Sequence, residues 1–223
     1  LYAQLTGTTV DYGAAHSAAH SHARYGIAYD RPLFDGWGTR RAVNLVGHSF
    51  GGATTRLFLE LMTNGSAEEV AAAKAAGTAP SPLFTGGKSS WVHSMTEVAA
   101  PHNGTTFIES NGTIMDVSTN LAETLAKGFG ITELKNLLDF QLEQFGIYKD
   151  PDETVLETLQ RVFSTDFLSH NDNAFLDLTI DRSLEINDGI GIEPNVYYFS
   201  YAGNQTVQDP VSGNYIPSAR MWT

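Results

Sequence analysis

The chain has 223 residues, of which 42% are hydrophobic, and a chain of this size can bury the core of one domain. Its 13 basic and 25 acidic residues give a formal net charge of −12, which argues against nucleic acid and anionic membrane surfaces as partners. No stretch approaches the roughly 18 to 20 apolar residues of a transmembrane helix. The absence of cysteine excludes disulfides and thiolate metal sites.

The N-terminal end, Leu1-Tyr2-Ala3-Gln4, has no initiator methionine and no basic or apolar region of a signal peptide. The C-terminal end, Met221-Trp222-Thr223, carries no obvious stop signal. We therefore expect a processed chain or a central fragment of a larger protein, incomplete at both ends.

The first forty residues are rich in glycine and alanine and contain three of the seven histidines, His16, His20 and His22. On a regular helix His16 and His20 would share a face, whereas His22 would point away. Two interpretations are open from the residues alone. The histidines could bind a metal ion, or they could cap a buried polar turn.

A short β-branched run, 42–46, predicts a buried strand that leads directly into Gly47-His48-Ser49-Phe50-Gly51-Gly52. Apolar residues at helical spacing follow over 53–62, and Asn64-Gly65 ends that helix. The order of strand, glycine-flanked turn and helix is the order of a nucleophile elbow.

The segment Gly47-x-Ser49-x-Gly51 matches G-x-S-x-G, a motif that is common by chance but informative between a strand and a helix. Ser49 is the candidate nucleophile, and small flanking residues let strand and helix pass closely. The backbone N–H of Phe50 would lie at a helix N-terminus, where it can donate to a developing oxyanion. Strand alternation points His48 away from Ser49, so His48 is not the expected base.

Downstream, Ser66 and Glu69 predict a capping box at the start of a helix that runs to about Ala76. Core strands are expected at 91–99 and 196–201, and amphipathic helices at 117–145 and 151–163.

The chain resembles the zinc-containing bacterial lipases of thermophilic bacilli and staphylococci over nearly its whole length. Several long motifs carry this resemblance: Tyr2-Ala3-Gln4-Leu5, Thr9-Val10-Asp11-Tyr12-Gly13-Ala14-Ala15-His16, His22-Ala23-Arg24-Tyr25-Gly26, Gly47-His48-Ser49-Phe50-Gly51-Gly52, Ser81-Pro82-Leu83-Phe84, Ala100-Pro101-His102-Asn103-Gly104-Thr105-Thr106 and Gly213-Asn214-Tyr215.

The resemblance implies an α/β-hydrolase with a mostly parallel central sheet flanked by helices. Residues 1–223 would form a single, incomplete domain, with a zinc-binding extra region at 1–40 and lid helices at 110–150. The same periodicity at 110–150 also fits an ordinary packed helix pair. The implied protein is a secreted triacylglycerol lipase that forms an acyl-enzyme and acts on medium- or long-chain acyl esters at an oil–water interface.

The family uses a Ser-Asp-His triad, in which Ser49 matches the nucleophile. Phe50 stands where the family has a polar residue, but a backbone N–H contact survives this change. The triad Asp and His, and a calcium site, are expected beyond Thr223. Asp188 is interpreted as a loop residue. His102 matches a family position that is not the base, and His170 is a candidate by residue type alone.

The family's structural zinc ligands match His16, His22 and Asp172, with a fourth ligand, an Asp, expected before Leu1. Two nitrogens and two oxygens would close a tetrahedral shell with no open position for catalysis. His20 is then a bystander, and Asp11 could support the ligands from outside the shell.

Two alternatives remain open. The same elbow could serve an esterase or a polyester hydrolase. If the chain is complete, the missing triad residues favour a non-catalytic zinc-stabilised scaffold.

Overall fold

The computed structural model describes residues 1–106, 148, 150, 152–153, 157, 161 and 171–218. The lid expected at 110–150 and the helix expected at 151–163 lie almost entirely outside the described residues, and His170 lies outside them too. Within the described part, no helix is both long and apolar enough to cross a membrane.

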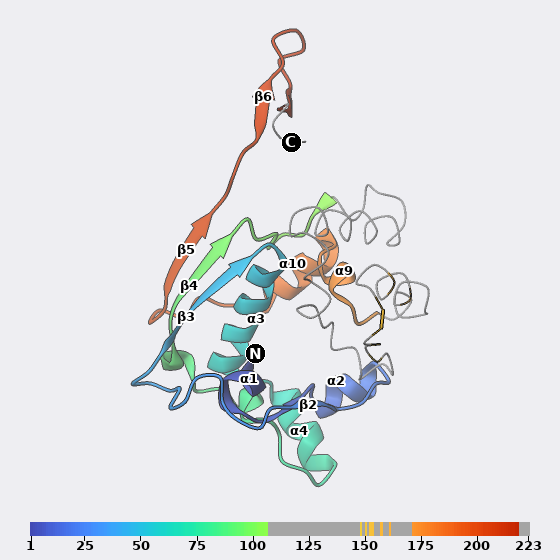
Figure 1. The fold of residues 1–223 in the computed structure, drawn as a ribbon, viewed down its shortest axis with the longest axis vertical. Coiled ribbons are helices and arrows are strands. Elements are labelled where there is room, and N and C mark those ends of the chain that lie inside the picture. The colour runs from blue at the N-terminus through green and yellow to red at the C-terminus, as the bar shows by residue number, and fades with distance from the viewer. Residues whose placement is uncertain are drawn as a thin grey trace.

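Three parallel strands form the central sheet, in the order β3 (Val43–His48), β4 (Val92–Val98), β5 (Tyr197–Tyr201). Figure 1 shows them side by side. Because the strands are parallel, their carboxyl ends meet at one edge of the sheet, where ligands bind in open α/β folds. The three predicted core strands and the α/β class are therefore confirmed.

Helix α3 (Phe50–Asn64) begins directly after β3 and packs against the sheet. The Met62 side chain is fully buried in the resulting core. Trp37 also enters this core, and its indole N–H donates to the Trp91 carbonyl at 3.0 Å. The buried core residues come from α3, β3, β4 and the segments beside them: Trp37, Leu45, Phe58, Leu59, Met62, Val92, Met95 and Val196.

Helix α4 (Ala67–Ala75) starts at Ser66, whose hydroxyl accepts the Glu69 N–H at 3.3 Å as predicted. The reciprocal bond of the expected capping box, from the Ser66 N–H to the Glu69 side chain, does not form. The Ser66 N–H donates to the Phe84 carbonyl, and the Glu69 carboxylate turns instead to the backbone of Ala15 and His16. A tertiary contact with two donors has displaced the local one. The 3₁₀ helices η1 (Pro82–Thr85) and η2 (Ser89–Trp91) then lead to β4.

The N-terminal region forms a small unit outside the main sheet (Figure 1). Its two strands pair antiparallel, and its second helix packs against α4. The elements are α1 (Tyr2–Thr6), β1 (Thr9–Asp11), α2 (Ala14–Ala19) and β2 (Tyr25–Ala28).

The C-terminal part contains α9 (Ala174–Asp177), α10 (Ile180–Asp188) and the hairpin β6 (Thr206–Gln208) and β7 (Tyr215–Pro217). In Figure 1 this hairpin extends away from the end of the sheet. The interpretation of Asp188 as a loop residue is wrong, because it is the last residue of α10. The neighbouring Asn187 accepts a hydrogen bond from Arg56 of α3 at 2.6 Å, which holds the last turn of α10 in place.

Candidate active site and metal centre

Ser49 lies between β3 and α3 with φ 54° and ψ −129°, a strained conformation for a residue other than glycine. Its N–H donates to the Val98 carbonyl at 3.0 Å, which fixes the turn to strand β4. Serine at a helix N-cap usually accepts a backbone N–H, but the Ser49 hydroxyl makes no such bond. The strained backbone thus holds an exposed hydroxyl that the helix does not use for capping.

Two glycines allow this turn. A Cβ on Gly47 would lie 2.5 Å from the Gly52 Cα, and a Cβ on Gly52 would lie 2.3 Å from the Ala100 Cβ. Gly51 belongs to the motif, but among the described residues a Cβ added to it would meet nothing within 4 Å other than its adjoining residues and the backbone of its own helix. Close packing of strand and helix therefore requires Gly47 and Gly52, and the expectation that Gly51 contributes to it is not supported.

Phe50 is the first residue of α3, so its N–H has no partner inside the helix. The positive end of the helix macrodipole lies at the same place. An anionic oxygen near Ser49 would therefore meet a backbone donor in a favourable field.

Sequence reasoning missed an acidic group beneath the elbow. Glu97 of β4 is only 5% exposed, and its Oε2 lies 2.6 Å from Nε2 of His102. The Thr55 hydroxyl of α3 lies 3.4 Å from Oε1. Burial raises the pKa of Glu97, and His102, Thr55 and Arg56 oppose that shift. The available sequence signal was that Glu97 is the one acidic residue in the predicted core strand 91–99.

His16, His22 and Asp172 lie together although they are far apart in the chain. Oδ2 of Asp172 is 3.2 Å from Nε2 of His16 and 3.2 Å from Nε2 of His22. One ligand atom from each residue lies within 4.8 Å of the others. Ligands of a tetrahedral zinc ion at its usual bond lengths are about 3.3 Å apart, so both distances and the donor types fit zinc.

The local structure prepares these side chains as ligands. The Nδ1 of His22 lies 2.8 Å from the Ala23 carbonyl, which can only accept, so Nδ1 carries the proton and Nε2 faces Asp172. Asn173 caps helix α9 through its side chain, and this fixes the backbone next to Asp172. The ring of His20 contacts Asn171 instead, with Nδ1 2.9 Å from Oδ1.

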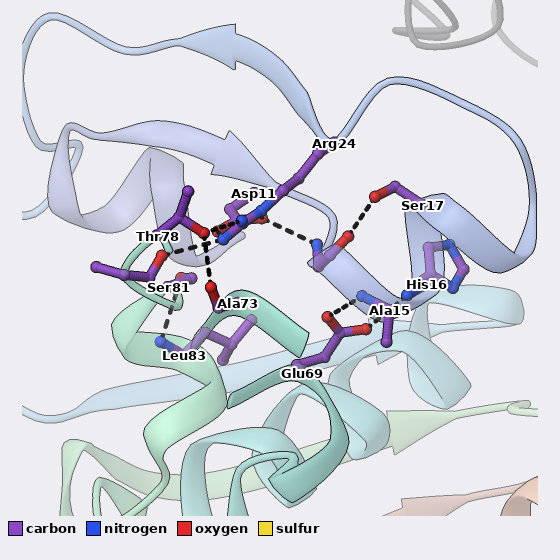
Figure 2. Close-up of polar contacts among 12 residues, drawn as sticks. Asp11, Ala15, His16, Ser17, Arg24, Glu69, Ala73, Thr78, Ser81 and Leu83 are labelled. Atoms are coloured by element: carbon purple, nitrogen blue, oxygen red, sulfur yellow. Dashed lines mark hydrogen bonds and ion pairs between the residues drawn. The ribbon is translucent and has the colours of Figure 1, made fainter. Parts of the chain in front are cut away.

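A second layer of polar contacts supports this segment (Figure 2). Asp11 accepts the Gly13 N–H at 3.0 Å and pairs with Arg24 through two bonds of 2.8 Å. Arg24 also donates to the Thr78 hydroxyl at 2.7 Å, beside α4. Asp11 therefore ties together both ends of the segment that carries His16 and His22.

Glu69 contributes a further support. Its carboxylate rises from α4 toward α2 in Figure 2 and accepts the N–H groups of Ala15 and His16 at 2.8 Å each. A Cβ on Gly13 would lie 2.4 Å from the Glu69 carboxyl carbon, so only glycine leaves space there. The buried carboxylate thus sets the backbone of one histidine of the group.

The parallel strands, the crossing helix and the strained serine turn define an α/β-hydrolase fold. The sequence profile of the family described as "Lipase-like, C-terminal domain" matches residues 1–221, and the chain belongs to this family. The resemblance inferred from the motifs is thereby confirmed.

Individual relatives agree with this assignment. The chain is 38% identical to Lipase 2 of Staphylococcus aureus over 211 residues, which covers 95% of this chain and 30% of that protein. Among solved structures it is similar to EstA from Clostridium botulinum, with a TM-score of 0.87, 32% identity, and coverage of 98% of this chain and 50% of that one. It is also similar to Staphylococcus hyicus lipase, with a TM-score of 0.75, 31% identity, and coverage of 97% and 55%. The chain thus spans only part of each relative.

The two glycines of α3 provide a matched test of the elbow. We expect Gly52→Ala to destabilise the protein by about 1–3 kcal/mol, because its methyl group overlaps Ala100 and Glu97. Gly51→Ala should be neutral or stabilising by up to about 1 kcal/mol, because alanine favours the helix. Urea unfolding of both variants measures the difference. Equal free energies of unfolding would show that the packing at Gly52 does not constrain the turn.

Proposed function

We propose that the protein is a carboxylic-ester hydrolase of the triacylglycerol lipase type, with Ser49 as its nucleophile. The observation that carries this proposal is the strained Ser49 backbone, held by the Val98 carbonyl at the head of a helix. Family membership supports the ester-hydrolysing class. Lipid at an oil–water interface is the proposed substrate, and secretion is the proposed location.

The Ser49 hydroxyl would attack the ester carbonyl, and the Phe50 N–H would donate to the oxygen that becomes negatively charged. The alcohol would then leave, and water would release the acid from the acyl-enzyme. Proton transfer requires a histidine oriented by an aspartate, and we propose that both follow Thr223 in the protein. We propose the same location, after Thr223, for the calcium site that the resemblance implies.

We propose that His16, His22 and Asp172 bind zinc, together with a fourth ligand before Leu1. When bound, the ion would serve as a structural cross-link between the 1–40 region and the start of α9, because four protein ligands leave no position for substrate. Supporting this, the two Nε2–Oδ2 distances of 3.2 Å match a tetrahedral edge.

Active-site labelling tests the nucleophile. In the intact protein we expect a fluorophosphonate to add to Ser49 stoichiometrically, because the reagent mimics the acylation step. Intact mass and peptide mapping locate the adduct. Ser49→Ala should abolish both labelling and ester hydrolysis, whereas Ser90→Ala, at an exposed position within η2, should leave both unchanged.

Failure of the intact, zinc-replete protein to react would contradict the hydrolase proposal and favour a non-catalytic scaffold. Hydrolysis rates on triacylglycerol emulsions, short acyl esters and a synthetic polyester then separate the lipase from the esterase and polyester alternatives. Preference for long-chain emulsions is the result that the lipase proposal requires.

The zinc proposal is tested at Glu69 and its exposed neighbour Glu68. Glu69→Gln replaces an acceptor of two N–H groups by an amide, so the backbone at His16 should shift and zinc affinity should fall about 10- to 100-fold. Glu68→Gln on the same helix is the control and should bind zinc like the wild type. Competition with a chromophoric chelator gives the dissociation constants. Equal affinities for the two variants would contradict a supporting role for Glu69.

A further inference from the structure

A closed ring of side-chain contacts lies beneath the serine turn. It begins at Thr55 and Arg56 on α3 and passes from Thr55 to Glu97 of β4, with 3.4 Å between Oγ1 and Oε1. Glu97 pairs with His102, whose Nε2 lies 2.6 Å from Oε2. The His102 carbonyl accepts a hydrogen bond from the Asn187 amide, and the side-chain oxygen of Asn187 accepts from Arg56 at 2.6 Å. The ring therefore joins α3, β4, the loop after β4 and α10.

Glu97 brings this ring against the strand side of the elbow. In the parallel register it stands beside Gly47, two residues before Ser49. A Cβ on Gly52 would lie 2.5 Å from its Oε2, so the carboxylate fills the space that the glycine leaves in the first turn of α3. Movement of this carboxylate would be transmitted directly to the turn that presents the Phe50 N–H.

The loop that carries His102 has its own constraints. Ala99 adopts φ 49°, which is unfavourable for alanine, and its N–H donates to the Tyr201 carbonyl of β5 at 2.8 Å. The Thr105 N–H donates to the Leu178 carbonyl beside α10. His102 is thus presented to Glu97 by a loop that is fixed at both ends.

A contribution to folding stability does not explain why a carboxylate, that of Glu97, occupies this buried position. Burial raises the pKa of Glu97 above the usual 4.5, in spite of His102 on the loop and Arg56 on α3. A raised pKa in the folded state means that the stability contributed at low pH is lost as pH rises through that pKa. Ionisation of Glu97 therefore lowers the free energy of unfolding relative to the protonated form.

We propose that Glu97 and His102 are positioning residues for the reaction at Ser49. The pair fixes the first turn of α3 relative to the loop after β4, so that the Phe50 N–H points to the oxyanion position. This inference rests on the proposed function. Because the oxyanion exists only after the carbonyl is attacked, the pair acts on kcat and leaves KM nearly unchanged.

Kinetics of the intact enzyme on a soluble p-nitrophenyl ester test the pair. For Glu97→Gln we expect kcat to fall about 10- to 100-fold, the effect of a small displacement of a reacting group, with KM within about twofold. His102→Gln should give a similar loss, and the double variant should lose little more than either single one, because the two residues act together. Glu68→Gln, and His93→Gln at an exposed position of β4, are the matched controls and should retain wild-type kcat.

Thermal unfolding of the same variants separates positioning from a structural role. As pH rises above the usual pKa of a glutamate, the wild type should lose stability relative to Glu97→Gln, since only the wild type must ionise a buried carboxylate. A variant that is at least as stable at pH 8 but slower supports the proposal. A variant whose stability and kcat both fall at every pH would overturn it, and so would an unchanged kcat.

Failure of the proposed function is distinguishable from failure of this inference. If the wild type and both controls neither hydrolyse esters nor react at Ser49, the hydrolase proposal fails, and the role of the pair fails with it. If the wild type is active and Glu97→Gln matches it, the inference alone is overturned.

Discussion

Helix α3 can begin directly after β3 only because no side chain stands between Gly47 and Gly52, whose added Cβ atoms would overlap their neighbours. This close approach forces Ser49 into its positive φ and places the Phe50 N–H at the free end of the helix. The same approach brings α3 over Glu97, where the glycine leaves space for a carboxylate. The exposed serine, the N-terminus of helix α3 and the buried Glu97 next to them thus have one steric origin.

The group formed by His16, His22 and Asp172 likewise depends on buried side chains around it. Its residues do not hold themselves in place, because the Asp11–Arg24 pair and the Glu69 carboxylate fix the backbone around the histidines. Both supports are buried or partly buried carboxylates that accept backbone N–H groups. These hydrogen bonds offset the free-energy cost of removing a charged carboxylate from water. The acidic composition of the chain is therefore not only a surface property, since Glu69 and Glu97 both lie in the interior.

Local signals predicted the parts of the fold that depend on neighbouring residues. The three core strands, helix α3 and the Ser66 cap follow from runs of apolar residues, glycines and a hydroxyl next to a helix start. Contacts between distant segments escaped prediction. Glu69 was assigned to Ser66 three residues away, but its carboxylate binds residues 15 and 16. Helical spacing grouped His16 with His20, and only the resemblance pointed to His22 and Asp172. The Glu97–His102 pair could not be predicted, because it depends on how the loop after β4 folds back.

The sequence distance between the metal-binding residues has a consequence for folding. Asp172 follows His22 by about 150 residues, and bringing them together costs the closure entropy of that whole segment. The three residues meet only where the start of α9 lies against the N-terminal unit. An ion held by all three would therefore report that these two distant parts of the chain have come together.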